Sequence, residues 1–164
     1  KKIFKYFDVI MSISLKKINF NKNNFNYYFK IIFGFRNNSD YLKLNKIKKV
    51  SRNNSYNWLL NNKRKRIFFL IKYKKKNAGI FNFNKVNPTF SQVILKKYRN
   101  KKIGKTSAKM LLLKLKKLGY FKLITFASKK NIASYNIHKE ISFKSKLYNK
   151  KNNFYKFFIN TKNF

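Results

Sequence analysis

The sequence predicts an α+β domain built on a mixed, mostly antiparallel sheet of about six to seven strands. Two apolar runs, 67–73 and 78–83, are separated by a short polar turn and predict an antiparallel hairpin. A strongly helical segment lies between the strand-like runs 90–95 and 121–127. That order favours a parallel pair of strands joined by a crossover helix.

The N-terminal half predicts one strand and two helices. Residues 11–18 alternate apolar and polar side chains, the period of a half-buried strand. Residues 24–35 have apolar side chains at helical spacing, with Gly34 as the expected C-cap, and the polar run 36–40 predicts a loop. Residues 51–62 predict a short helix capped by Ser51 or Asn54, with Trp58 and Leu59 as its apolar anchors.

The C-terminal half predicts two helices and three strands. Residues 103–118 repeat leucine at steps of three and four, which predicts an amphipathic helix with Gly119 at its C-cap. A buried strand is expected at 121–127 and a second helix at 132–141. Runs 143–148 and 154–159 are the expected closing strands.

The composition argues against hydrolytic and metal-dependent chemistry. The 164 residues include no cysteine, one histidine and three acidic residues, Asp8, Asp40 and Glu140. Disulfides and thiolate metal sites are therefore excluded. A zinc centre, a carboxylate pair or a Ser-His-Asp triad is hard to assemble from so few groups, so we expect no metal.

The net charge of +39 has two interpretations. Clustered Lys and Arg neutralise phosphates, and the run Lys63-Arg64-Lys65-Arg66 is the densest basic patch. The chain is also rich in Lys, Asn, Ile, Phe and Tyr, which AT-rich codons encode. We favour mutational drift in an AT-rich genome, with the charge spread over solvated faces, and keep a nucleic-acid contact as the alternative.

Residues 1–10 precede the first predicted strand. The sequence begins with Lys1, and we interpret this segment as an N-terminal extension or the remnant of a longer chain. Residues 11–164 then form a single domain large enough to bury a core. No apolar run approaches the ~18 residues of a membrane span and no signal peptide is recognised, so we expect a cytoplasmic protein without membrane contact.

A basic turn opens directly into the leucine-rich helix. It reads Arg99-Asn100-Lys101-Lys102-Ile103-Gly104-Lys105. Backbone N–H groups and the helix dipole at such an N-terminus can hold a phosphate. A second motif follows, with Asn131, Ser134, Ile137-His138-Lys139 and Phe143.

Together the two motifs resemble the GNAT-family N-acetyltransferases. The family patterns are Arg/Gln-x-x-Gly-x-Gly/Ala and Asn-x-x-Ala/Ser-x-x-Leu-Tyr-x-Lys-x-Gly-Phe. Lys102 and Ser142 stand where these patterns have glycine. If Lys102 must adopt a positive φ, its backbone is strained by ~1–2 kcal/mol.

The resemblance implies a three-layer αβα fold and acetyl-CoA as cofactor. In the family, the strand before the turn pairs with the pantetheine arm, and the turn wraps the pyrophosphate. Asn131 would be a cofactor ligand, although its role as a helix N-cap is sufficient by itself. The implied cofactor-binding residues are Val93, Leu95, Arg99, Asn100, Lys102, Ile103, Gly104, Lys105, Asn131 and Ser134.

The resemblance also suggests how the acetyl group is transferred. His138 stands where many family members have a tyrosine that protonates the CoA thiolate, and an imidazole can do the same. Tyr135 is the alternative acid, and packing in the core is an equally good explanation of His138. A backbone N–H near Leu95 would steady the oxyanion. Glu140 should face away from His138, so no general base is identified.

The acceptor is predicted to be a primary amine on a small molecule, most simply an anionic nucleotide-linked amino sugar. Arg36, Asn37 and Trp58 match, in order, an Arg-Asn pair and a tryptophan helix on the acceptor side of such enzymes. The alternatives are a ribosomal-protein or peptide N-terminus, and a non-enzymatic basic protein that binds RNA or the ribosome. The oligomeric state is not predicted.

Overall fold

The computed structural model describes residues 12–45, 48–142, 144–151 and 153–164. Seven strands form one open sheet in the order β1-β2-β3-β4-β5-β7-β6. The predicted extension 1–10, together with Met11 and Phe143, lies outside the described residues. The strands are β1 Ile13–Lys17, β2 Arg66–Tyr73, β3 Lys76–Asn84, β4 Thr89–Ile94, β5 Lys122–Ser128, β6 Lys144–Asn149 and β7 Phe154–Asn160.

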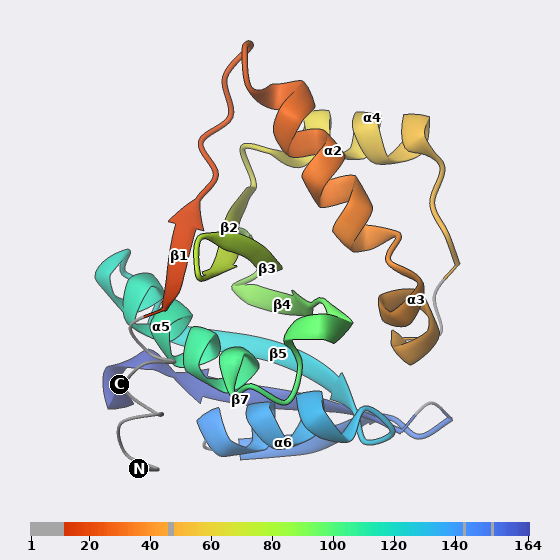
Figure 1. Cartoon of the computed structure of the whole chain (residues 1–164). Helices are drawn as coiled ribbons and strands as arrows, with labels where there is room; N and C mark the ends of the chain where they lie inside the picture. The colour runs from red at the N-terminus through yellow and green to blue at the C-terminus, as the bar shows by residue number, and fades with distance from the viewer. Residues whose placement is uncertain (1–11, 46–47, 143, 152) are drawn as a thin grey trace.

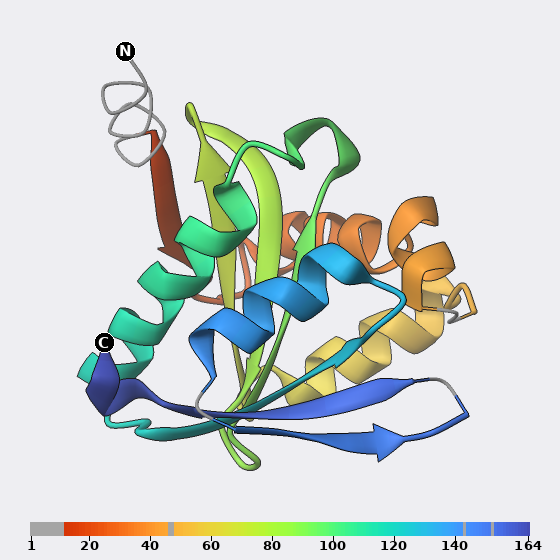
Figure 2. The same ribbon diagram turned by 90° about the horizontal axis from the view of Figure 1, so that it is seen from below.

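The helices cover both faces of this sheet (Figures 1 and 2). None of those in the described ranges combines the length and apolar content that a membrane crossing requires. They are α2 Phe25–Arg36, α3 Ser39–Asn45, α4 Arg52–Asn62, α5 Ile103–Lys117 and α6 Ile132–Ile141, with 3₁₀ turns η1 Lys96–Tyr98 and η2 Thr161–Asn163.

Side chains of β2 alternate between two hydrophobic cores. Phe69 and Ile71 pack in the core beneath α5, whereas Phe68 and Leu70 pack in the core with α2 and α4. This is the period-two alternation of a strand, with both faces buried. The layers are therefore helix, sheet and helix, which confirms the predicted architecture (Figure 2).

The parallel pair β4–β5 is short, and the candidate functional site lies where its pairing ends. Only Thr89 with Ile124 and Phe90 with Thr125 are in register, while every other neighbouring pair in the sheet is antiparallel. The buried Thr125 hydroxyl donates to the Phe90 carbonyl at 3.0 Å. Beyond this point the C-terminal halves of β4 and β5 are no longer paired, so the sheet is split.

The N-terminal helices differ from the prediction in two places. Gly34 lies inside α2, because the buried Phe35 continues the apolar face and Asn37 is the C-cap. The polar run 36–40 is not a loop throughout, because α3 begins at Ser39. Asn38 caps it, and its Oδ1 accepts from the Tyr41 N–H at 3.2 Å. Asn, Ser and Asp form turns and helix caps through the same hydrogen bonds, so the sequence pattern did not distinguish them.

Other predicted boundaries are confirmed. Ser51 caps α4, and its Oγ accepts from the Asn54 N–H at 3.2 Å. Gly119 follows the C-cap of α5 with φ +83. The Tyr120 N–H bonds to the carbonyl of Leu115, which completes a Schellman motif. The β2–β3 hairpin turn is tighter than predicted, since β3 already begins at Lys76.

Candidate active site

A cavity of about 560 Å³ lies where β4 and β5 separate, bordered by the N-terminal turns of α5 and α6. It brings together residues that are far apart in the sequence. His138 lines it, as does every predicted cofactor residue except Leu95: Val93, Arg99, Asn100, Lys102, Ile103, Gly104, Lys105, Asn131 and Ser134.

In the basic turn, residues 99–105, the backbone adopts the conformation for which the family pattern has a glycine. Lys102 is the N-cap of α5 and has φ +57, so it holds a left-handed conformation where the family pattern has glycine. The first bond of the helix runs from the Thr106 N–H to the Lys102 carbonyl at 3.0 Å. The N–H groups of Ile103 and Gly104 precede it and have no acceptor within the helix. The turn therefore presents donors and positive charge to the cavity.

Gln92 fixes this turn against β4, a contact that the sequence pattern did not reveal. Its Nε2 donates to the Gly104 carbonyl at 3.0 Å and to Ser107 Oγ at 2.9 Å. A Cβ on Gly104 would lie 3.1 Å from Ile137 Cδ1, so the glycine also allows α6 to approach. These contacts set the distance between the turn and the floor of the cavity.

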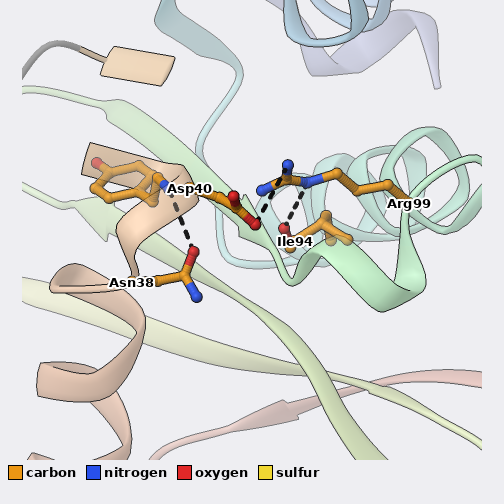
Figure 3. Close-up of polar contacts among 5 residues, drawn as sticks. Asn38, Asp40, Ile94 and Arg99 are labelled. Atoms are coloured by element: carbon orange, nitrogen blue, oxygen red, sulfur yellow. Dashed lines mark hydrogen bonds and ion pairs between the residues drawn. The ribbon is translucent and has the colours of Figure 1, made fainter. Parts of the chain in front are cut away.

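Arg99 points back toward the strand and not along the turn (Figure 3). Its Nε donates to the carbonyl of Ile94 at 3.1 Å. Its Nη1 lies 3.9 Å from Asp40 Oδ2, and both side chains are about one-third exposed. Arg99 thus links the end of β4 to α3 while lining the cavity.

The N–H group predicted near Leu95 to steady the oxyanion is not that of Leu95 itself. Its N–H donates to the Ala78 carbonyl at 3.0 Å, and its side chain packs against both cores. An N–H already bonded within the sheet cannot steady an oxyanion. Successive peptide groups of a strand point to opposite edges, so the N–H of Ile94 points to the open side of β4.

His138 is buried on the floor of the cavity. Its side chain is 4% exposed, and the ring lies between Phe90 and Phe157, with centroid distances of 5.8 and 5.7 Å. Nδ1 lies 2.6 Å from the carbonyl oxygen of Ser134, one turn earlier. The helix is started by Asn131, whose Oδ1 accepts from the Ser134 N–H at 3.4 Å. The position of His138 is therefore set by its own helix.

The Ser134 contact also assigns the tautomer of His138. A carbonyl oxygen only accepts, so the hydrogen is on Nδ1, and Nε2 of the neutral ring has a lone pair. Burial lowers the pKa of His138, and the Ser134 hydrogen bond opposes this shift without cancelling it. At neutral pH the ring is uncharged, and Nε2 accepts a proton before it can donate one.

The other ionisable candidates on α6 face away from the cavity. The Tyr135 ring packs edge to face against Tyr155 and Phe157 and does not line the cavity. Glu140 is 43% exposed, and its Oε1 pairs with Lys105 Nζ at 2.7 Å and Lys109 Nζ at 3.4 Å. The Lys105 hydrogen bond is the main cause that lowers the Glu140 pKa. Glu140 joins α6 to α5, and it faces away from His138 as predicted.

The three predicted acceptor residues are not among those that line the cavity. Arg36 stacks on Trp58, with Cζ 4.9 Å from the ring centroid, so Trp58 is a half-buried stacking partner. The Asn37 side chain bonds the Val50 backbone in both directions, at 2.9 and 3.0 Å. Asn37 therefore fixes the chain after α3, and Tyr41 of that helix reaches the cavity in its place.

Comparison with known proteins gives a fold match without a sequence match. No family model and no curated protein matches the sequence. A domain from Methanocaldococcus jannaschii DSM 2661 has a TM-score of 0.72 and 20% identity, covering 90% of this chain and 99% of that one. Spermidine N-acetyltransferase from Vibrio cholerae, solved with CoA and spermine, has a TM-score of 0.72 and 11% identity, covering 93% and 97%.

The same Vibrio cholerae enzyme in a dodecameric intermediate state has a TM-score of 0.65 and 12% identity, covering 92% of this chain and 95% of that one. The two Vibrio cholerae structures are of an N-acetyltransferase, and all three matches extend over 90% or more of this chain. The predicted GNAT fold is therefore confirmed.

Proposed function

We propose that this protein is an acetyl-CoA-dependent N-acetyltransferase that modifies a primary amine. One observation carries the proposal: the split between β4 and β5 places the basic turn of α5 and the buried His138 on the same cavity. A phosphate-binding turn and a proton acceptor in one cavity suit acyl transfer from a phosphorylated carrier.

The residues of the turn fit the anionic part of coenzyme A. The N–H groups of Ile103 and Gly104 and the side chains of Lys102 and Lys105 would hold its pyrophosphate. The edge of β4 that faces away from β3, at Ile94, would hold the pantetheine arm as a further strand. Bound there, acetyl-CoA supplies the thioester that is transferred.

The chain supplies two further functions at the reacting end. The Ile94 N–H points to the open side of β4, where it can donate to a carbonyl oxygen that gains negative charge. His138 Nε2, neutral at pH 7, accepts the proton that the attacking amine must lose. The resulting imidazolium then returns that proton to the departing sulfur. One residue serves as base and acid in turn, so the lack of a nearby carboxylate is no obstacle.

The charge of the cavity favours an anionic acceptor. Arg99, Lys102, Lys105 and Lys130 line it, and no carboxylate is among its described lining residues. Asp40 pairs with Arg99 and Glu140 with Lys105, so these four cations keep a net positive charge. A polyamine of the kind bound to the Vibrio cholerae enzyme would be repelled by these cations. An amino sugar linked to a nucleotide phosphate would be attracted. We therefore propose an amino-sugar nucleotide as the acceptor, with a ribosomal-protein or peptide N-terminus as the second candidate.

Thermal shift and thiol release test the proposal together. We expect millimolar coenzyme A to raise Tm, and free thiol to appear with acetyl-CoA and an amino-sugar nucleotide. Spermidine and an N-terminal ribosomal peptide are run as alternative acceptors under the same conditions. Absence of a Tm shift with coenzyme A would refute the cofactor. A shift with release only toward spermidine would retain the enzyme and refute the anionic acceptor.

A further inference from the structure

A second, larger cleft lies at the opposite end of the sheet from the candidate active site. Its volume is about 970 Å³, and it lies among the end of β1, the connection to α2, the α4–β2 turn and the connection after β3. β2 and β4 run in the same direction, since each is antiparallel to β3. The cleft is at the start of β2 and the active site is at the end of β4, so the two lie at opposite ends of the strands.

Six cations line this cleft, which we call the basic cleft: Lys17, Lys22, Lys63, Arg64, Arg66 and Lys85. They come from four segments that the fold brings together. The Lys85 N–H donates to the Lys65 carbonyl at 2.9 Å, and the Ile18 N–H donates to the Phe68 carbonyl at 2.8 Å.

No carboxylate side chain of the described residues neutralises these cations. Asp40 pairs with Arg99, and Glu140 pairs with Lys105 and Lys109, all outside the basic cleft. Burial, and to a smaller extent the positive charge of Arg36, lower the pKa of Arg66.

Aromatic rings lie between the cations. Phe20, Phe25, Tyr56 and Tyr120 also line the cleft. Tyr56 meets Phe25 edge to face at 5.3 Å, and Phe20 tilts against Phe25 at 5.7 Å, so these rings are already fixed by packing. Lys63 Nζ lies 5.0 Å from the Phe25 centroid. Phe20, Tyr56 and Tyr120 are half-buried, so part of each ring is exposed beside cations that can reach a phosphate backbone, as stacked bases and their phosphates require.

We propose that the basic cleft binds a single-stranded polynucleotide, with phosphates on its lysines and arginines and bases against its aromatic rings. Polynucleotide binding is independent of acetyl transfer, because the basic cleft and the active site lie at opposite ends of the strands. The basic run Lys63 to Arg66, recognised in the sequence, provides three of the six cations.

The test compares two charge-matched variants of the whole chain. The cleft variant is K22Q/R64Q/K85Q and the control is K144Q/K146Q/K150Q; all six residues are exposed, so both should fold, which circular dichroism checks. Binding of fluorescent 12-nucleotide oligo(U) and oligo(dT) is measured by anisotropy at several salt concentrations.

We expect the cleft variant to lose at least about tenfold in affinity for the oligonucleotide. The slope of its affinity against salt concentration should fall by about 2, at ~0.7 per phosphate contact. The control should lose less than about twofold. Equal losses would overturn the proposal, since the whole surface would then be the site.

A second pair of variants tests the stacking. F20L removes a ring from the cleft, and Y27L removes an exposed ring elsewhere. We expect only F20L to weaken oligonucleotide binding, and inorganic polyphosphate to compete poorly at equal phosphate concentration. Equal competition by polyphosphate, with no effect of F20L, would reduce the cleft to a plain polyanion site and contradict the proposal.

Discussion

Arg99 Nε donates to the carbonyl oxygen of Ile94 at 3.1 Å, so the residue that opens the basic turn also holds the end of β4 (Figure 3). The bond is made at the strand edge where the sheet is split. The same guanidinium lies 3.9 Å from Asp40 on α3. The backbone of the proposed thioester site is therefore fixed by a side chain of the proposed phosphate site.

Replacing Arg99 by Ala should weaken coenzyme A binding about tenfold. A charged hydrogen bond to a partly buried carbonyl contributes about 1.5–3 kcal/mol, and its loss loosens β4 at Ile94. Isothermal titration calorimetry with coenzyme A measures this. Asp40→Asn is the control, because an ion pair at 3.9 Å with both side chains about one-third exposed contributes about 0–1 kcal/mol. If D40N were as damaging as R99A, the ion pair and not the Ile94 bond would be the important contact.

Replacing Lys102 by Gly should stabilise the protein and weaken its cofactor binding. Lys102 has φ +57, and glycine adopts this conformation without the ~1–2 kcal/mol cost of a side chain. Tm should rise by a few degrees, at about 2–4 °C per kcal/mol for a chain of this size. Affinity for coenzyme A should fall, because a cation beside the phosphates is lost.

Lys101→Gly is the matched control for this change. Lys101 is also exposed and basic, but its φ is not positive, so glycine only adds flexibility to the unfolded chain. K101G should lower Tm slightly. A fall in Tm for K102G as well would show that the left-handed turn is not strained.

Burial of a neutral His138 should make the wild-type protein less stable in mild acid. Its pKa is lowered in the folded state, so below about pH 6.5 the unfolded chain binds a proton that the folded chain does not. Stability is full above pH 6.5 and is lost as pH falls from there toward the folded pKa. Urea unfolding at pH 7.5 and pH 5.5 should show a larger loss for wild type than for His138→Phe.

The same residue should shape the pH profile of catalysis. If Nε2 is the base, kcat/KM rises with pH through a pKa below 6.5. His138→Phe should lower kcat by about 10²–10⁴-fold with coenzyme A affinity unchanged. If H138F had the same rate and the same pH profile as wild type, His138 would have no catalytic role and would only pack between Phe90 and Phe157.

Periodicity was sufficient to predict the helices and strands whose buried face repeats along the chain, whereas the short helix α3, Ser39–Asn45, was not predicted. Leu111, Leu112 and Leu115 of α5 all point to one core, and the side chains of β2 alternate between two. The paired motifs also predicted most of the cavity, since Lys102 and His138 lie where backbone geometry places them. Gln92 and Tyr41 were missed because their contacts depend on the packing of β4 and α3, which no local pattern encodes.

The misassigned residues have the same cause. Leu95 was included at the site because of the family resemblance, but the N–H direction alternates along a strand, and its own N–H faces Ala78. Asn37 was predicted to contact the acceptor, and its amide is instead bonded to Val50, thirteen residues away. Short polar side chains such as these are used wherever backbone groups need partners, and only the tertiary structure decides where.

Replacing Gly79 by Ala tests whether the split in the sheet is essential to the site. A Cβ at this position would lie 2.3 Å from the Val93 carbonyl oxygen, so β3 can approach β4 beside the cavity only with glycine there. Gly79→Ala should push β4 out of line, lower the free energy of unfolding by at least about 1–3 kcal/mol, and weaken coenzyme A binding.

Gly34→Ala is the control, because a Cβ at this position on α2 would meet nothing within 4 Å. It should stabilise the helix by about 0.5–1 kcal/mol. Chemical denaturation and calorimetry measure both effects. A G79A protein that binds coenzyme A normally would show that the position of Val93 does not govern the cavity.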